Sequence, residues 1–138
     1  MKTIRMMRFM LALSATPLMA QVKGHNPFID ANKVVSNYAA SLGHHNEGVV
    51  ESAIFQVLKL KQAYPDMAMP RIREQLRKLA LHGANQTIRY KAFIALSWMD
   101  QPAALREIDM PIDNADGAFR QMADGLEREL RSADVVTP

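Results

Sequence analysis

Histidine and acidic side chains gather at one turn of this chain in a way that could suggest a metal site. His44, His45 and Glu47 lie close together in the sequence, and His82 lies at the corresponding turn farther along. Adjacent histidines on an ordered backbone should point apart, and no histidine or carboxylate follows either of them at the i,i+4 helical spacing that would bring two ligands together. We therefore predict a surface turn and no metal ion.

A second group of acidic residues occupies the segment 109–117, where Asp109, Asp113 and Asp116 could suggest calcium. Calcium loops place oxygen ligands at alternate positions around a glycine at a fixed place in the loop. The glycine of this segment, Gly117, does not fit that spacing. We interpret the polar side chains as turn formers and as a cap for a following helix.

Motifs for catalysis are missing from the sequence. No serine lies in a Gly-x-Ser-x-Gly elbow, and no glycine-rich phosphate or dinucleotide loop occurs. The chain has no cysteine, which excludes disulfides and thiol chemistry. We predict no catalytic residues and no cofactor.

The best candidate surface lies on the fourth of the helices that the sequence predicts. Tyr90, Ile94 and Trp98 recur every four residues and form a second apolar strip on the side of that helix opposite its main apolar face. Either this strip packs beneath the C-terminal helix, or it forms an exposed groove for a partner peptide or helix. Arg89 and Lys91 would flank such a groove, so all five residues are candidates for binding a partner.

The elements that must position these residues are all helical. Apolar residues recur at helical spacing, and no segment alternates as a strand would over more than a few residues. We expect Gly43 to end the first helix in the left-handed conformation. Helices are predicted from Asn26-Pro27 to residue 42 and over 46–64, 70–82, 86–100 and 115–132, with a helical turn at 102–108 and a frayed tail at 133–138.

Two blocks of the chain come into register when the sequence is shifted by 39 residues (85 − 46). Asn46 then aligns with Asn85, and Ala53 aligns with Ala92. Each block consists of a turn, a capping asparagine and a helix with a small residue at the point where two helix axes approach. A repeat of about 40 residues built from two helices is typical of an α-solenoid.

The second block, NQTIRYKAFIALSWM, resembles the second helix of a HEAT repeat, in which an aliphatic–arginine pair precedes spaced alanines and a leucine. The matching residues are Ile88, Arg89, Ala92, Ala95 and Leu96. The first block departs from the pattern, because Val50 replaces the arginine. The resemblance covers residues 27–108 and implies stacked units at 27–68 and 69–108, with a small bundle of about five helices as the alternative fold. A HEAT-like array implies a non-catalytic module that binds a protein or peptide.

The amino terminus is typical of a secretory signal. Three basic residues precede the apolar segment FMLAL, and Thr16-Pro17 and small residues up to Ala20 follow it. This apolar segment is far shorter than the roughly 20 residues of a membrane-spanning helix, and charges interrupt every later apolar run. We predict cleavage near Ala20, a periplasmic or secreted protein, and a single helical domain over 21–132.

Cleavage would remove the positive charge of the chain. The net charge of +3 comes from 17 basic and 14 acidic residues, and the signal carries Lys2, Arg5 and Arg8, which leaves 14 basic residues (17 − 3). A neutral protein gives no reason to expect a nucleic-acid partner.

Charge is nevertheless distributed unevenly along the chain. Residues 59–91 are basic and residues 100–134 acidic, so these regions either attract each other within the chain or join copies into a homo-oligomer. Such an assembly subunit is the alternative function; a small envelope enzyme or metal-binding protein ranks third.

The predicted signal can be tested on protein recovered from its host. We expect the mature chain to begin at Gln21, because Ala20 provides the small residue that precedes a cleavage site. Intact-mass measurement and amino-terminal sequencing would show this, and a mature chain that still begins with Met1 would contradict it.

Overall fold

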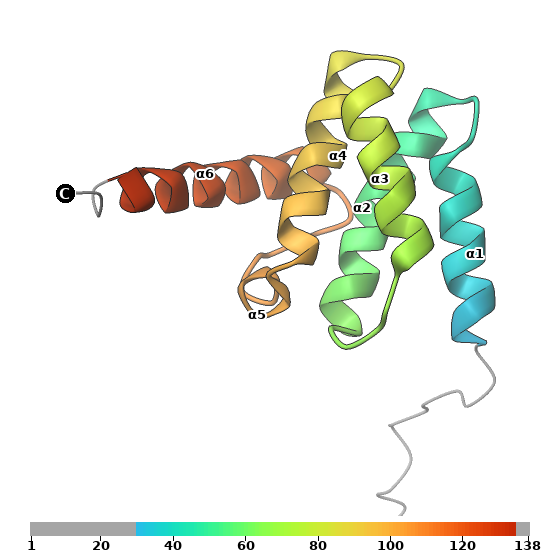
Figure 1. The fold of residues 1–138 in the computed structure, drawn as a ribbon, viewed down its shortest axis with the longest axis horizontal. Helices are drawn as coiled ribbons and strands as arrows, with labels where there is room; N and C mark the ends of the chain where they lie inside the picture. The colour runs from blue at the N-terminus through green and yellow to red at the C-terminus, as the bar shows by residue number, and fades with distance from the viewer. Residues whose placement is uncertain (1–29, 135–138) are drawn as a thin grey trace, which may run out of the picture.

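The computed structural model describes residues 30–134, and every element in that range is a helix (Figure 1). The predicted all-α fold class is confirmed, and the predicted signal lies outside the described residues. The helices are α1 (Ala31–Leu42), α2 (Glu47–Ala63), α3 (Pro70–His82), α4 (Gln86–Met99), α5 (Pro102–Leu105) and α6 (Ala115–Asp134).

The two asparagines that align in the sequence both cap helices. The Asn46 side-chain oxygen accepts a hydrogen bond from the Val49 N–H at 3.2 Å, and the Asn85 oxygen accepts one from the Ile88 N–H at 2.8 Å. Each bond satisfies a backbone donor that the first turn of a helix leaves without a partner. The starts of α2 and α4 therefore follow from local sequence.

Both ends of α1 differ from the prediction. The expected start at Asn26-Pro27 lies outside the described residues, and α1 itself begins after Asp30, whose carboxylate caps it. Gly43 has φ −90° and ψ 8°, so the left-handed conformation predicted for it is wrong. Its N–H donates to the Ala40 carbonyl at 3.1 Å, which tightens the last turn and satisfies that carbonyl without a left-handed residue.

Helices α1 to α4 run alternately up and down as two antiparallel pairs (Figure 1). Helix α1 packs against α2 and α3, and α4 also packs against α2 and α3. Helices α1 and α3 thus form one layer, while α2 and α4 form the other. Helical bundles and repeat arrays both use this arrangement, so the resemblance to HEAT repeats stays a prediction.

One buried cluster draws residues from all six helices. Helix α2 contributes Val50, Ala53 and Val57 at helical spacing and also Ile54, Phe55 and Leu58. Val49 and Tyr64, at the two ends of this segment, are exposed. Because α2 packs against α1, α4 and α5, burial extends around more of the helix than a single stripe.

Helix α6 lies across α4, and its C-terminal end projects beyond the other helices (Figure 1). The Trp98 side chain of α4 is only 6% exposed, and its indole N–H donates to the Met122 carbonyl at 3.1 Å. Gly125 faces the same ring so closely that an added Cβ would lie 2.9 Å from the indole Cζ2. The absence of a side chain at Gly125 allows α6 to approach the indole.

The packing of Trp98 predicts a large effect on stability. Replacing Trp98→Ala should lower the free energy of unfolding by about 3–5 kcal/mol, because it removes a buried ring that two helices share. Phe93→Ala, at an exposed position of the same helix, should change it by less than about 0.5 kcal/mol. Urea unfolding of both variants measures the difference, and equal losses would contradict the assignment of Trp98 to the core.

Candidate functional site

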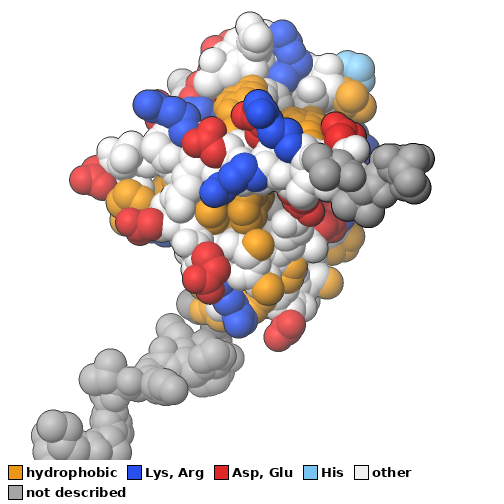
Figure 2. Space-filling view, turned by 90° about the vertical axis from the view of Figure 1, so that its left-hand side faces the viewer, with side chains coloured by type: hydrophobic (Ala, Val, Ile, Leu, Met, Phe, Trp, Pro, Cys, Tyr) orange, Lys and Arg blue, Asp and Glu red, His pale blue; other side chains and the backbone are white. Residues whose placement is uncertain are grey.

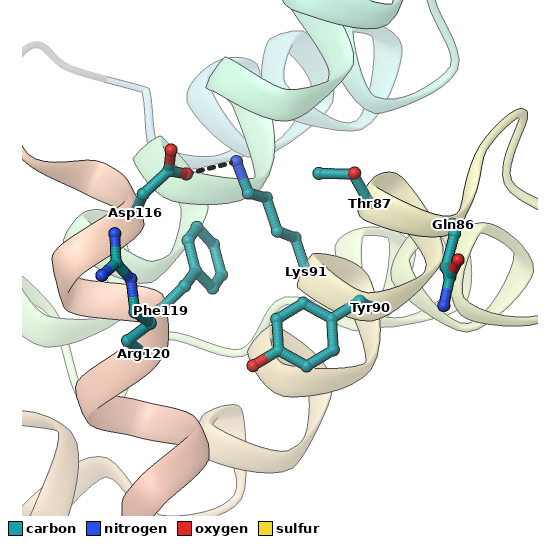
Figure 3. Close-up of a pocket in the computed structure, with 7 residues that line it drawn as sticks. All are labelled: Gln86, Thr87, Tyr90, Lys91, Asp116, Phe119 and Arg120. Carbon is teal, nitrogen blue, oxygen red and sulfur yellow. Dashed lines mark ion pairs between the residues drawn. The ribbon is translucent and has the colours of Figure 1, made fainter.

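An open groove of about 440 Å³ lies between the first half of α4 and the start of α6 (Figure 3). Its lining residues are Gln86, Thr87, Tyr90, Lys91, Asp116, Phe119 and Arg120. The groove combines an aromatic residue at the surface with charged groups of both signs. Two of the five residues predicted to bind a partner, Tyr90 and Lys91, belong to it.

The predicted strip on α4 divides between the surface and the core. Tyr90 is 44% exposed and lines the groove, whereas Ile94 and Trp98 are buried. Residues four apart on a helix of 3.6 residues per turn are offset by about 40°, so the strip winds from the groove toward the side that α6 covers. Trp98 packs beneath the C-terminal helix, which is one of the two arrangements that the sequence left open, and Ile94 is buried.

The two basic residues predicted at the rim have different surroundings. The Arg89 guanidinium donates to the Gly83 carbonyl at 2.9 Å, which holds the turn between α3 and α4. Lys91 turns toward α6 and enters the groove (Figure 3). Arg89 therefore shapes the turn, while Lys91 belongs to the candidate site.

Lys91 joins three helices. Its ammonium lies 2.9 Å from the Glu51 carboxylate of α2 and 2.7 Å from the Asp116 carboxylate of α6. It also lies 5.5 Å from the ring centroid of Phe119, within the range of a cation–π contact. Only 12% of the Lys91 side chain is exposed, so these contacts are less screened by water than a surface ion pair.

The pKa values of this pair follow from the contacts. Burial tends to lower the pKa of Lys91, but the hydrogen bonds and negative charges of Asp116 and Glu51 outweigh burial and raise it above its usual value. The hydrogen bond from Lys91, with the lysine charge, lowers the pKa of the Asp116 carboxyl. Both groups are therefore held in their charged forms near neutral pH.

Sequence reasoning missed the role of Asp116. The cap of α6 is Asn114, whose side-chain oxygen accepts from the Gly117 N–H at 3.0 Å, and this leaves Asp116 to pair with Lys91. No local pattern links residues 25 positions apart (116 − 91). Phe119, Met122 and Leu126 recur at helical spacing in the sequence, and this periodicity is a signal that Phe119 faces the other helices.

The histidine turn differs from its prediction. The rings of His44 and His45 stack with their centroids 4.2 Å apart, so the expectation that adjacent histidines diverge is wrong. The Asn46 N–H donates to His44 Nδ1 at 3.0 Å and thereby fixes the orientation of that ring. Among residues 30–134, no group of three or more histidine or acidic side chains is placed to hold a metal ion.

Some basic residues of the 59–91 region form ion pairs with acidic residues of the 100–134 region of the same chain. Arg73, from the basic region, pairs with Asp100 of the acidic region at 2.6 Å, and Lys91 pairs with Asp116 in the same way. Figure 2 shows basic and acidic side chains intermixed around exposed hydrophobic ones on the face toward which α6 projects. Charges that could join two copies are thus partly paired inside one chain.

Comparison with protein-family models, curated proteins and solved structures finds no match to this chain. Within residues 30–134, none of the helices combines the length and the apolar character needed to cross a membrane.

The ion pair between Lys91 and Asp116 can be tested by measuring the pKa of the Asp116 carboxyl group. Lys91→Met should raise the Asp116 pKa toward the ordinary value of about 3.9, because the hydrogen bond and the positive charge are lost. Carbon-detected NMR titration of the Asp116 carboxyl measures this change. An unchanged pKa would contradict the ion pair.

The same pair makes a small, pH-dependent contribution to stability. Because folding lowers the Asp116 pKa, this contribution is present above the ordinary carboxyl pKa and disappears as pH falls through the lowered one. Asp116 is 70% exposed, so Asp116→Asn should cost less than about 1 kcal/mol at neutral pH. The cost should begin to fall below about pH 4 and vanish once the pH is below the lowered pKa of Asp116. The same substitution in a Lys91→Met background is the control and should show no such pH dependence, because the ion pair is already absent there.

Proposed function

We propose that this protein is an exported module that binds a protein or peptide, and that the groove between α4 and α6 receives the partner. The observation that carries the proposal is the position of Tyr90. Its ring is partly exposed at the edge of a preformed groove, and Phe93 lies exposed one turn farther along α4. Exposed aromatic residues beside a groove are the side chains that most often anchor a protein partner.

The charged groups of the groove would orient that partner. Arg120 offers a planar group that can pair with a carboxylate or a backbone carbonyl of the ligand. Lys91 and Asp116 neutralise each other, which leaves Arg120 as the charge that the groove offers to a peptide with both apolar and acidic side chains. A volume of about 440 Å³ accommodates a few side chains of a partner rather than a whole helix.

Export and repeat architecture belong to the same proposal. The basic, apolar and small-residue order of residues 1–20 supports export. The two capping asparagines and the pairwise packing of α1 with α3 and of α2 with α4 support the alignment of two units. The uneven match of the first unit to HEAT repeats keeps the family assignment as a proposal.

Site-specific photo-crosslinking tests the groove. A photoreactive phenylalanine analogue in place of Tyr90 should form a crosslinked product of defined mass in the exported fraction of the host. The same analogue in place of Tyr64 is the matched control. Tyr64 is 43% exposed, like Tyr90, but it follows the C-terminal end of α2 and does not line the α4–α6 groove. Identical crosslinking patterns from the two positions would contradict the proposal.

A charge reversal complements the crosslinking. Arg120→Glu should weaken the crosslink at position 90 while leaving the melting temperature nearly unchanged, because Arg120 is exposed at the surface of α6. A full crosslink yield in this variant would place the partner outside the groove.

A further inference from the structure

A second groove, between α1 and the first half of α2, has a different chemical character. It encloses about 390 Å³ and is lined by Tyr38, Ser41, Asn46, Gly48, Val49, Ser52, Ala53 and Gln56. None of these described lining residues is charged. The α4–α6 groove is of similar size but contains Lys91, Asp116 and Arg120. The two grooves therefore suit different kinds of ligand.

Helix geometry builds the uncharged groove from two facing surfaces. Ser52 and Gln56 lie four residues apart on α2 and share one face with Val49. Tyr38 and Ser41 lie three residues apart on α1 and face them across the groove. This face of α2 thus presents the neutral polar side chains of Ser52 and Gln56 beside the small apolar ones of Val49 and Ala53.

The polar groups of the groove retain hydrogen-bonding capacity. The Ser41 hydroxyl donates to the Asn37 carbonyl at 3.0 Å and can still accept a hydrogen bond. The Asn46 side-chain oxygen is used by its helix cap, which leaves the amide hydrogens as donors. Within the described residues, no hydrogen bond uses the Ser52 hydroxyl or the Gln56 side-chain amide. The groove thus offers both donors and acceptors, all of them neutral.

We propose that this groove binds an uncharged carbohydrate. A charged ligand would lose hydration without gaining an opposite charge, and a purely apolar ligand would leave the hydroxyl and amide groups without partners. A sugar ring presents hydroxyl groups that both donate and accept, and its C–H face packs against an aromatic ring such as that of Tyr38. The cavity falls in the roughly 300–1,000 Å³ range of small-molecule sites. This site is independent of the α4–α6 groove.

Titration of the isotope-labelled protein with maltose and with N,N′-diacetylchitobiose, followed by NMR, tests the proposal. At least one sugar should shift the backbone amides of the lining residues of α1 and α2, with an affinity that does not change between low and high salt. Gln56→Ala and Ser52→Ala should each weaken binding by roughly three- to tenfold, as the loss of one neutral hydrogen bond implies. Gln86→Ala, in the other groove, is the matched control and should bind like the wild type.

Three results would overturn the carbohydrate site. The first is that neither sugar shifts the amides of the lining residues up to its solubility limit. The second is that charged glucuronate binds as tightly as the neutral sugars, and the third is that Gln56→Ala binds sugar like the wild type. None of these outcomes bears on the crosslinks expected from position 90, because those arise at the α4–α6 groove.

Discussion

The organisation of this protein depends on helix α4 being apolar on more than one side. Ile88, Ala92 and Ala95 pack toward the helices that precede α4, while Ile94 and Trp98 need cover on the other side. Helix α6 provides that cover, and the chain returns to it through α5 and the following loop (Figure 1). Cover by α6 leaves Tyr90 at its edge, so the candidate groove is a direct result of where α6 crosses α4.

The sequence predicted the helices well because their signals are local. Capping by Asn46 and Asn85, the proline that opens α3 and the helical spacing of apolar residues all act within a few positions. The contacts that assemble the site are not local. The approach of Trp98 to Gly125 and the pairing of Lys91 with Asp116 depend on the angle at which α6 returns, and no pattern in the sequence specifies that angle.

The two grooves of the protein differ in chemistry although each lies beside a helix that an asparagine caps. Asn46 caps α2 and Asn85 caps α4, yet the surfaces beyond these caps differ. The second pair meets α6 and gains Asp116 and Arg120, whereas the first pair presents only neutral side chains to its groove. The element that joins each helix pair, more than the pair itself, determines which ligand could bind there.

Gly125 has a consequence for the order in which the chain assembles. Glycine inside a helix disfavours the helical state by about 1 kcal/mol relative to alanine, and α6 contains both Gly117 and Gly125. The indole of Trp98 leaves no room for a better helix former at position 125. Helix α6 therefore has weak helical preference before it docks and gains much of its stability from α4. Formation of α6 is therefore expected to follow formation of α4, which supplies the indole ring against which Gly125 packs.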